Sequence, residues 1–546
     1  MRRFSPYASC LLLIGLVWST AASSLNYEFV YDDVAVVVER RPFWEEGLSN
    51  FFRSNHWGTG RQATLVSLDL DRLWNDTGAR AFHRTNAVLA TLVTLLVWSL
   101  ARRFSLSAVG ALVTAALFAV HPVHVDAVVA VVGRAELLAA LGVLVALLAS
   151  VDAPAVIDGA PARCGGAAAQ ARRFLLVLCA SLLGVFSKES AACLPILLLA
   201  SRWALGRRVK VAVPLAAIAI ALVLWAVSAA PSVGKGITPE FVDNPLVSAP
   251  AFERIPKALA VLGDYFKLSL WPHPLLLDRS YAQTDPTVAG GHAAALGWAA
   301  YCGVALELRR RKARSAALAL AWFPLAFAVS GNVVLPIGTI MAERLLFLPS
   351  LGPCLLAGAA IDAARRRGRL PYGVAAAIAA TGLAAFIPLF LTRAAVWASN
   401  DVYLPASAAA SPRSAKAWYD LGLWRATGGG GQASPEAAEA AWRRALEILP
   451  NFHRANYELA ESLGRRGQPL AGAEVYERFL KEVPDDTGAL MNVTRLLLSA
   501  RQPRRANAYA QRLLQLEPES EAARETLLLT EAALNRSQVQ ALPVSP

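Results

Sequence analysis

The sequence predicts an all-α protein in which a polytopic membrane bundle precedes a short array of helical repeats. The 546 residues are 55% hydrophobic and only 17% charged, with a mean hydropathy of +0.42. A soluble domain usually carries about 25% charged residues. Prolines also recur at a constant spacing near the C-terminus. We expect a membrane domain over residues 1–400, repeats over 401–530 and a flexible tail over 531–546.

Apolar runs long enough for membrane helices are frequent in the first 400 residues. A spanning helix needs about 20 mainly apolar residues. The segment 255–277 is apolar but carries Lys257, Asp264 and Lys267, which predicts an interfacial or re-entrant segment. The first run also resembles a cleaved signal peptide. About eleven spans are predicted, at 8–25, 85–101, 107–121, 128–150, 174–187, 190–205, 211–229, 291–307, 315–335, 344–362 and 371–392.

Basic clusters fall in every second loop between these runs. Residues 401–546 contain 17 Lys+Arg and 17 Asp+Glu, so the whole net charge of +13 lies in the apolar part. This is the positive-inside pattern, and it argues against nucleic-acid binding. It predicts a cytoplasmic N-terminus and an extracytoplasmic C-terminal tail. The clusters are Arg2/Arg3, Arg102/Arg103, Arg172/Arg173, Arg207/Arg208/Lys210, Arg309–Lys312 and Arg365–Arg369.

The C-terminal region carries a repeat with a fixed period. Pro450, Pro484 and Pro518 are each 34 residues apart. A 34-residue period with a proline after each helix pair is the signature of tetratricopeptide repeats (TPR), and about three repeats are near the minimum for a stable stack. The six cysteines show no metal-ligand spacing, so we expect neither a zinc site nor a disulfide framework. The array predicts a binding surface for a protein.

Ionisable residues gather in the loops that this topology places outside the membrane. Such residues at span ends are costly and need a reason. One is usually a solvated cap or an ion pair, but several on one face suggest a polar cavity. They are Tyr31-Asp32-Asp33, His121 to Asp126, Arg134 with Glu136, Lys188-Glu189, Asp278-Arg279 and Glu343-Arg344.

This set of residues fits transfer of a sugar from a lipid phosphate to a hydroxyl group. A carboxylate can take the hydroxyl proton, and cations can hold the departing phosphate. The same set would also suit an anion transporter, although no internal repeat of spans is evident.

Four motifs resemble the family of transmembrane-and-TPR O-mannosyltransferases. The resemblance covers most of the chain and is most specific from His121 to Leu138. It implies a C-type glycosyltransferase fold with a luminal or periplasmic site. The family transfers mannose from a polyprenyl phosphate to Ser/Thr of secretory proteins. The motifs are Phe29-Val30-Tyr31-Asp32-Asp33, His121-Pro122-Val123-His124 with Gly133-Arg134-Ala135-Glu136, Ser187-Lys188-Glu189, and Ala342-Glu343-Arg344 through Ser350.

The resemblance assigns a role to each motif. It implies that Asp32 and Asp33 are the catalytic pair, with Asp33 or its neighbour as the base. Arg134 becomes a contact to the donor phosphate. The remaining residues implied at the cavity or its wall are Glu136, Lys188, Glu189, Glu343, Arg344, His83, Asn86 and His121.

Together, these observations predict an integral membrane glycosyltransferase. The expected partners are a polyprenyl-phosphate sugar donor, the membrane and a protein acceptor on the TPR surface. No cofactor and no metal site are expected, and a need for a divalent ion is left open. The alternative is a non-catalytic, membrane-anchored TPR scaffold for envelope proteins. High Ala and Arg usage suggests a bacterial inner membrane with a periplasmic tail, and otherwise an ER membrane with a luminal tail.

Overall fold

The computed structural model describes residues 5–47, 60–74, 78–152, 166–206, 209–229 and 240–540. Within these residues the regular elements are helices, with one isolated β-bridge between Val151 and Val209. The predicted all-α class is therefore confirmed. The chain divides into two compact units, one of Met1–Leu277 with Thr284–Tyr403 and one of Asp278–Gln283 with Leu404–Pro546.

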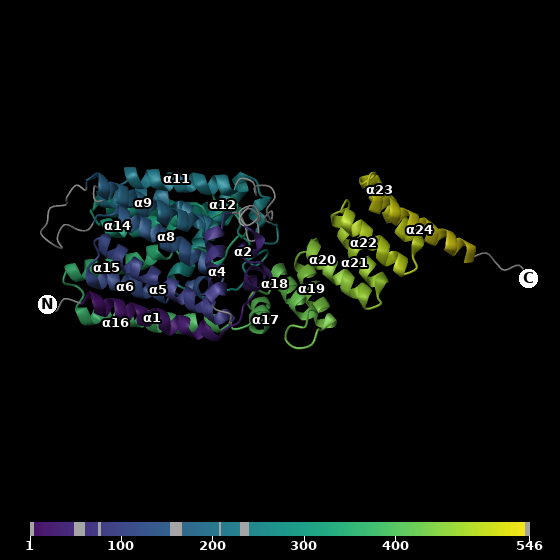
Figure 1. The fold of residues 1–546 in the computed structure, drawn as a ribbon, viewed down its shortest axis with the longest axis horizontal. Helices are drawn as coiled ribbons and strands as arrows, with labels where there is room; N and C mark the ends of the chain where they lie inside the picture. Colours follow the sequence, from purple (N-terminus) through teal and green to yellow (C-terminus); the bar gives the residue numbers. More distant parts are fainter. Residues whose placement is uncertain are drawn as a thin grey trace, which may run out of the picture. The chain divides into compact units, whose positions relative to one another are not determined.

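The first unit, called here the membrane unit, is a bundle whose long helices run side by side (Figure 1). Two short helices, α2 (Phe43–Glu46) and α7 (Val125–Val128), and the 3₁₀ turn η8 (Glu343–Leu346) lie outside the long rods. The long helices are α1 (Pro6–Ala21), α4 (Gln62–Trp74), α5 (Ala79–Arg103), α6 (Ala108–Ala119), α8 (Arg134–Ser150), α9 (Ala167–Val185), α10 (Leu194–Leu205), α11 (Ala212–Ala229), α12 (Ala251–Leu270), α13 (Val288–Arg310), α14 (Arg314–Ala326), α15 (Leu351–Arg366) and α16 (Tyr372–Ala395).

Each of the predicted spans overlaps one long helix, but several boundaries differ. Helix α8 begins at Arg134 rather than at 128, α14 ends at Ala326 rather than at 335, and α15 begins at Leu351 rather than at 344. Among the described residues, four helices are long and apolar enough to cross a membrane, or five with the bent pair formed by α6 and the following short helices. The chain is thus a multi-pass membrane protein, and the count of eleven stays a prediction.

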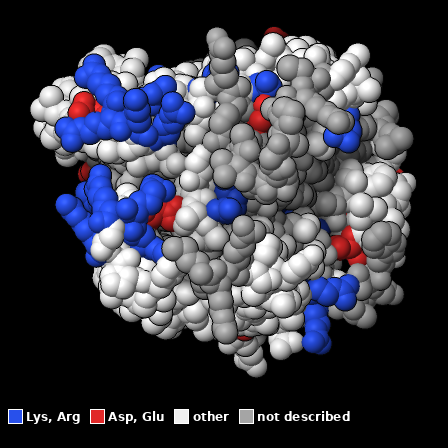
Figure 2. All heavy atoms as spheres, turned by 90° about the vertical axis from the view of Figure 1, so that its left-hand side faces the viewer, with Lys and Arg blue, Asp and Glu red and all other residues white. Residues whose placement is uncertain are grey.

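The basic clusters within the described residues lie together at one end of the membrane unit (Figure 2), whereas Arg2, Arg3, Arg207 and Arg208 lie outside the described residues. Figure 2 shows patches of Lys and Arg on this face with few acidic residues. The corresponding loops are joined by contacts: Arg173 and Lys210 both pair with Asp152, at 3.0 and 3.5 Å. Asp362 accepts hydrogen bonds from the backbone and hydroxyl of Ser107. The alternation of charge along the sequence therefore corresponds to one basic end in space.

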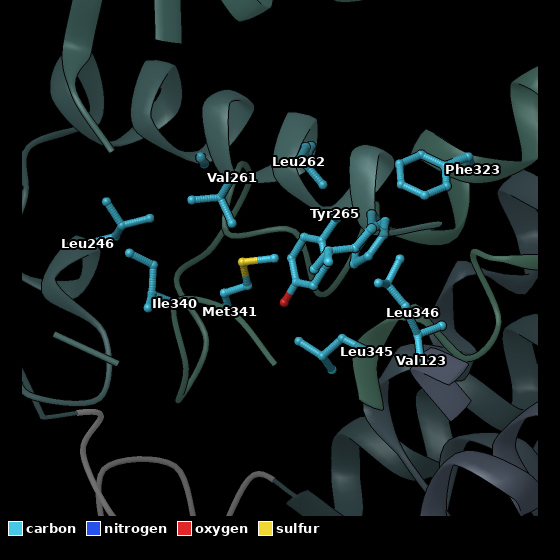
Figure 3. Close-up of a cluster of buried hydrophobic side chains, with 13 residues drawn as sticks. Val123, Leu246, Val261, Leu262, Tyr265, Phe323, Ile340, Met341, Leu345 and Leu346 are labelled. Carbon is cyan, nitrogen blue, oxygen red and sulfur yellow. The ribbon is translucent and has the colours of Figure 1, made fainter. Parts of the chain in front are cut away.

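Helix α12 occupies most of the segment predicted as interfacial. One face packs in an apolar cluster with Tyr265 near its centre (Figure 3). On the other face, Asp264 and Lys267 form an exposed ion pair at 2.8 Å. The Tyr265 hydroxyl accepts a hydrogen bond from the backbone N–H of Ala342 at 2.8 Å, just before η8. Helix α12 thereby fixes the start of the segment that carries Glu343 and Arg344.

The second unit, called here the repeat unit, holds the predicted helix pairs. Pro450, Pro484 and Pro518 each follow the second helix of a pair. Trp442 has no exposed surface, and a Cβ on Gly422 would lie 2.3 Å from its ring, so the first pair closes by a large-on-small contact. Helix α17 (Asn400–Ala410) belongs to the membrane unit as far as Tyr403 and to the repeat unit from Leu404. The other helices of the repeat unit are α18 (Ala415–Ala426), α19 (Pro435–Ile448), α20 (His453–Arg465), α21 (Pro469–Glu482), α22 (Thr487–Ser499), α23 (Pro503–Leu516) and α24 (Glu521–Gln540).

Two features of the repeat unit differ from expectation. Helix α24 continues to Gln540, so residues 531–540 are helical rather than a flexible tail. The segment Asp278–Gln283 belongs to this unit rather than to the polar cluster of the membrane unit. There the Asp278 carboxylate accepts a hydrogen bond from the Ser414 hydroxyl at 2.7 Å. This carboxylate is therefore engaged in capping the first repeat.

Candidate functional site

The end of the membrane unit opposite the basic face gathers most of the residues singled out above. Asp32 and Arg344 form an ion pair at 3.7 Å, with side chains 37% and 40% exposed. The rest of the predicted acidic and basic residues at this end are more buried. Asp32 with Arg344 is therefore the charged pair most accessible to a substrate among the predicted site residues.

The two carboxylates of the acidic pair lie in different surroundings. Asp33 is 1% exposed and accepts hydrogen bonds from the backbone N–H groups of Val30, Val131 and Val132, at 3.3, 3.2 and 2.8 Å. Burial raises its pKa to about 7, against the opposing effect of these N–H groups. Asp33 is thus engaged with the backbone, whereas Asp32 faces outward.

Asn86 binds the carbonyl groups of the turn before α8, the same turn whose N–H groups Asp33 binds. Its amide nitrogen donates to the carbonyls of Ala130 and Val131, at 2.9 and 3.3 Å. Buried backbone groups outside helices must find partners. The turn before α8 therefore has its N–H groups bound by Asp33 and its carbonyls bound by Asn86, which makes both residues structural parts of the turn.

Arg134 is fully buried, with 0% exposure. Its guanidinium donates to Asn86 Oδ1 at 2.9 Å, to Asp71 at 2.5 Å, and to the carbonyls of Ser67 and Phe82 at 2.8 and 3.0 Å. The Arg134 guanidinium therefore links α8 to α4 and α5 through hydrogen bonds. No part of Arg134 reaches the surface in this structure, and its expected contact with the donor phosphate stays a prediction.

Lys188 and Glu136 form a second buried pair. The Lys188 ammonium lies 2.6 Å from the Glu136 carboxylate, and both side chains are at most 6% exposed. Burial lowers the pKa of Lys188, although Glu136 opposes this effect. The two residues predicted from separate motifs are therefore brought together and neutralise each other.

Glu189 is paired with a residue that the sequence analysis missed. Arg61 donates to both of its carboxylate oxygens, at 2.8 and 3.2 Å. Burial alone would raise the pKa of Glu189, but Arg61 and Lys188 lower it to about 2. The start of α4 is fixed here because the Thr64 hydroxyl donates to the Ser187 carbonyl at 3.0 Å.

Glu343 is buried and paired, unlike its neighbour Arg344. Arg393 lies 2.9 Å from Glu343 and 3.5 Å from Asp126. The other Glu343 oxygen accepts the backbone N–H of Leu276 at 2.6 Å. Arg393 was missed, although one signal marks it: it is a lone basic residue at the end of α16 opposite the basic face.

The loop that carries Asp32 is held by the segment after α16. Tyr31 has a positive φ of 57°, and its N–H donates to Asn400 Oδ1 at 2.9 Å. Its ring stacks on that of Tyr403, with centroids 5.4 Å apart. A non-glycine residue in this conformation is uncommon and persists where its surroundings hold it. Sequence reasoning missed Asn400 and Tyr403.

The remaining predicted residues are buried. His121 is 1% exposed, and its Nε2 lies 3.1 Å from the Ser269 carbonyl oxygen. His83 is 2% exposed and lies edge-on to Tyr27, with ring centroids 6.5 Å apart. Over the described parts of the chain, no group of three His, Cys, Asp or Glu side chains is placed to hold a metal ion.

Fold and site together define a class: a multi-pass membrane protein with a TPR unit and a charged cluster at one end of its bundle. No family model matches the chain. Curated relatives nevertheless confirm the resemblance to transmembrane-and-TPR O-mannosyltransferases. Protein O-mannosyl-transferase TMTC3 of Mus musculus is 31% identical over 148 residues, 25% of this chain and 16% of the relative.

Two further curated relatives with the same kind of name are similar to this chain. Protein O-mannosyl-transferase TMTC1 of Mus musculus is 35% identical over 159 residues, 26% of this chain and 17% of the relative. Protein O-mannosyl-transferase Tmtc3 of Drosophila melanogaster is 27% identical over 434 residues, 64% of this chain and 46% of the relative. The chain spans only about a sixth of the length of the two mouse relatives, at 16% and 17%.

Proposed function

We propose that this protein is a membrane glycosyltransferase that transfers a sugar, mannose by analogy with its relatives, to Ser/Thr hydroxyls of proteins. The proposed donor is a polyprenyl-phosphate sugar, and the proposed site is the Asp32–Arg344 end of the membrane unit. This end would face the periplasm or lumen, together with the TPR unit. The names of the relatives support the reaction class.

One observation carries the proposal. A half-exposed carboxylate, Asp32, lies 3.7 Å from a half-exposed guanidinium, Arg344, while neighbouring charges are buried and paired with each other. A general base must be within reach of the hydroxyl proton. A cation beside the leaving phosphate stabilises the charge that develops there. A base and a phosphate contact are therefore available side by side.

In the proposed step, the Asp32 carboxylate takes the proton from the acceptor hydroxyl. The hydroxyl oxygen attacks the anomeric carbon, forming the new glycosidic bond. The bond between that carbon and the phosphate oxygen breaks, and the electron pair leaves with the polyprenyl phosphate. Arg344 binds the phosphate and holds it after departure. In this scheme Asp33 acts only through the turn that it holds.

The test uses the full-length protein in lipid vesicles with labelled polyprenyl-phosphate mannose and a Ser/Thr-rich peptide. The wild type should transfer label to peptide hydroxyls. Asp32→Asn should reduce turnover by about 10²–10⁴-fold, the usual contribution of a general base. Asp264→Asn, an exposed carboxylate paired with Lys267 on α12, is the matched control and should keep full activity.

The outcomes separate the alternatives. Transfer that survives Asp32→Asn would remove Asp32 from the mechanism. If the wild type transfers no tested sugar while deletion of residues 412–518 reproduces the null phenotype in cells, the TPR-scaffold alternative would replace the enzyme.

A further inference from the structure

The segment between α14 and η8 combines membrane-like composition with an irregular backbone. No ionisable residue lies between Arg314 and Glu343. By hydropathy this stretch belongs to one membrane span. In the structure, α14 is only 13 residues long, and the chain then continues through turns and bends to residue 340. The apolar loop over 331–340 is called here the braced loop.

The length of α14 does not suffice to cross a membrane by itself. A helix rises about 1.5 Å per residue, so its 13 residues cover roughly 20 Å. The hydrocarbon core of a bilayer is about 30 Å thick. The residues after Ala326 would have to cover the remaining distance of about 10 Å, which brings the braced loop to the edge of the hydrocarbon core.

Three polar side chains bind several carbonyl groups of the braced loop and the N–H of Ile337. One nitrogen of Arg254, on α12, lies 3.1 Å from each of the carbonyl oxygens of residues 332, 333 and 334. Asn332 donates to the carbonyls of Thr339 and Ile340, at 3.1 and 3.3 Å, and accepts the Ile337 N–H at 2.8 Å. Asn244 donates to the Ile337 carbonyl at 2.7 Å.

Backbone groups in a region that contains little water need hydrogen-bond partners from the protein. Irregular backbone within the hydrocarbon is tolerated only where it is buried in protein or lines a water-filled cavity, so an irregular loop at the edge of the hydrocarbon needs protein partners for its inward-facing groups. A loop in bulk water needs no such partners, because solvent supplies them. Asn332 also adopts a positive φ of 59°, which asparagine tolerates better than most residues. The hydrogen bonds of these three side chains therefore hold the braced loop in a defined conformation.

The tip of the braced loop is apolar and exposed. Val334 and Leu335 are 67% and 69% exposed, whereas Val333 and Ile337 pack inward on the apolar cluster of Figure 3. The same cluster includes Trp298 of α13. Helix α13 exposes Leu296 to 76% and buries little of its own surface, as a lipid-facing helix does. The braced loop and α13, a predicted span, therefore pack against the same apolar cluster.

We propose that the braced loop inserts Val334 and Leu335 into the hydrocarbon of the leaflet next to the Asp32–Arg344 end. The occupant of this surface is bilayer lipid. The proposal does not depend on the enzymatic activity, because it rests on depth, backbone satisfaction and exposure alone. It has a consequence for the site, since the loop leads directly into Glu343 and Arg344 and would hold them beside the leaflet.

Spin-label accessibility tests the proposal. Leu335→Cys is made in full-length protein whose own cysteines have been replaced, labelled, and reconstituted into vesicles of phosphatidylcholine and phosphatidylglycerol. Leu296→Cys on α13 is the lipid reference. Lys267→Cys, at a side chain 79% exposed on the polar face of α12, is the water reference. The label at 335 should collide with oxygen and avoid a nickel chelate, as the label at 296 does.

Two results would overturn the proposal. A label at 335 that collides with the nickel chelate like the label at 267 would place the tip in water. Protection from both reagents would mean that protein covers the tip. Val334→Cys repeats the measurement at the neighbouring position, so that a local disturbance by one label does not decide the outcome, and both labels must report lipid for the proposal to stand.

Discussion

The repeat unit and the polar end of the membrane unit are stabilised internally by different kinds of contact. In the repeat unit, apolar side chains at a fixed period close each helix pair, as Trp442 closes on Gly422. At the polar end, single ionic and amide groups join segments far apart in the sequence. The guanidinium of Arg134, for example, joins three helices. Periodic packing spreads stability over many contacts, whereas the polar end concentrates it in a few.

The comparison predicts its largest stability effect at Arg134. Arg134→Met should destabilise the membrane unit by about 3–5 kcal/mol, because it leaves the Asp71 carboxylate without its buried partner. Thermal unfolding of the purified protein in detergent would measure this. Arg134→Lys should rescue only part of the loss, since one ammonium cannot reach all the acceptors. A wild-type unfolding temperature in Arg134→Met would contradict the assignment.

Removing a large side chain from the repeats should cost a similar amount but act elsewhere. Trp442→Ala should destabilise the repeat unit by about 3–5 kcal/mol through the cavity that it leaves. Hydrogen exchange read by mass spectrometry should show lost protection in the helices around α18 and α19. Peptides of α5 and α8 should keep theirs. Equal loss in both units would mean that the two are one cooperative structure.

A smaller effect with a distinct pH dependence is expected at Asp33. Asp33→Asn leaves at least one backbone N–H of the turn without an acceptor, which costs about 1–3 kcal/mol. Because burial raises the pKa of Asp33 from 3.8 to about 7, its contribution to stability is full below 3.8 and is lost as pH rises through 7. Unfolding midpoints between pH 4 and 8 should therefore fall less steeply in the variant. Parallel slopes would contradict this.

The smallest effect is expected at the surface of the repeats. Arg512 and Asp485 form a pair at 2.9 Å whose side chains are 48% and 66% exposed. Exposed pairs contribute little, so Arg512→Ala should change stability by no more than about 0.5 kcal/mol. Chemical denaturation monitored by far-UV circular dichroism would show it. A loss as large as that for Trp442→Ala would mean that charge, and not apolar packing, holds the repeats.

The repeat unit could be predicted from the sequence more completely than the polar end of the membrane unit. The spacing of Pro450, Pro484 and Pro518 was enough to place the helix pairs, because each pair buries residues close in sequence. For the polar end, the motifs pointed to the right loops, and Asp32 and Arg344 do meet. The partners Arg61, Arg393 and Asn400 could not be paired from sequence, since they lie far along the chain from the residues that they contact.

By itself, the sequence determined the helical class, the membrane character, the basic end and the repeat period. Each of these follows from composition or from a local period, which a linear string records directly. Only the tertiary structure decided that Asp32 is exposed while Asp33 holds a turn, that Arg134 is sealed inside, and that the apolar run after α14 is a braced loop. Those outcomes depend on which distant groups satisfy a buried charge or backbone group, and no local pattern encodes that choice.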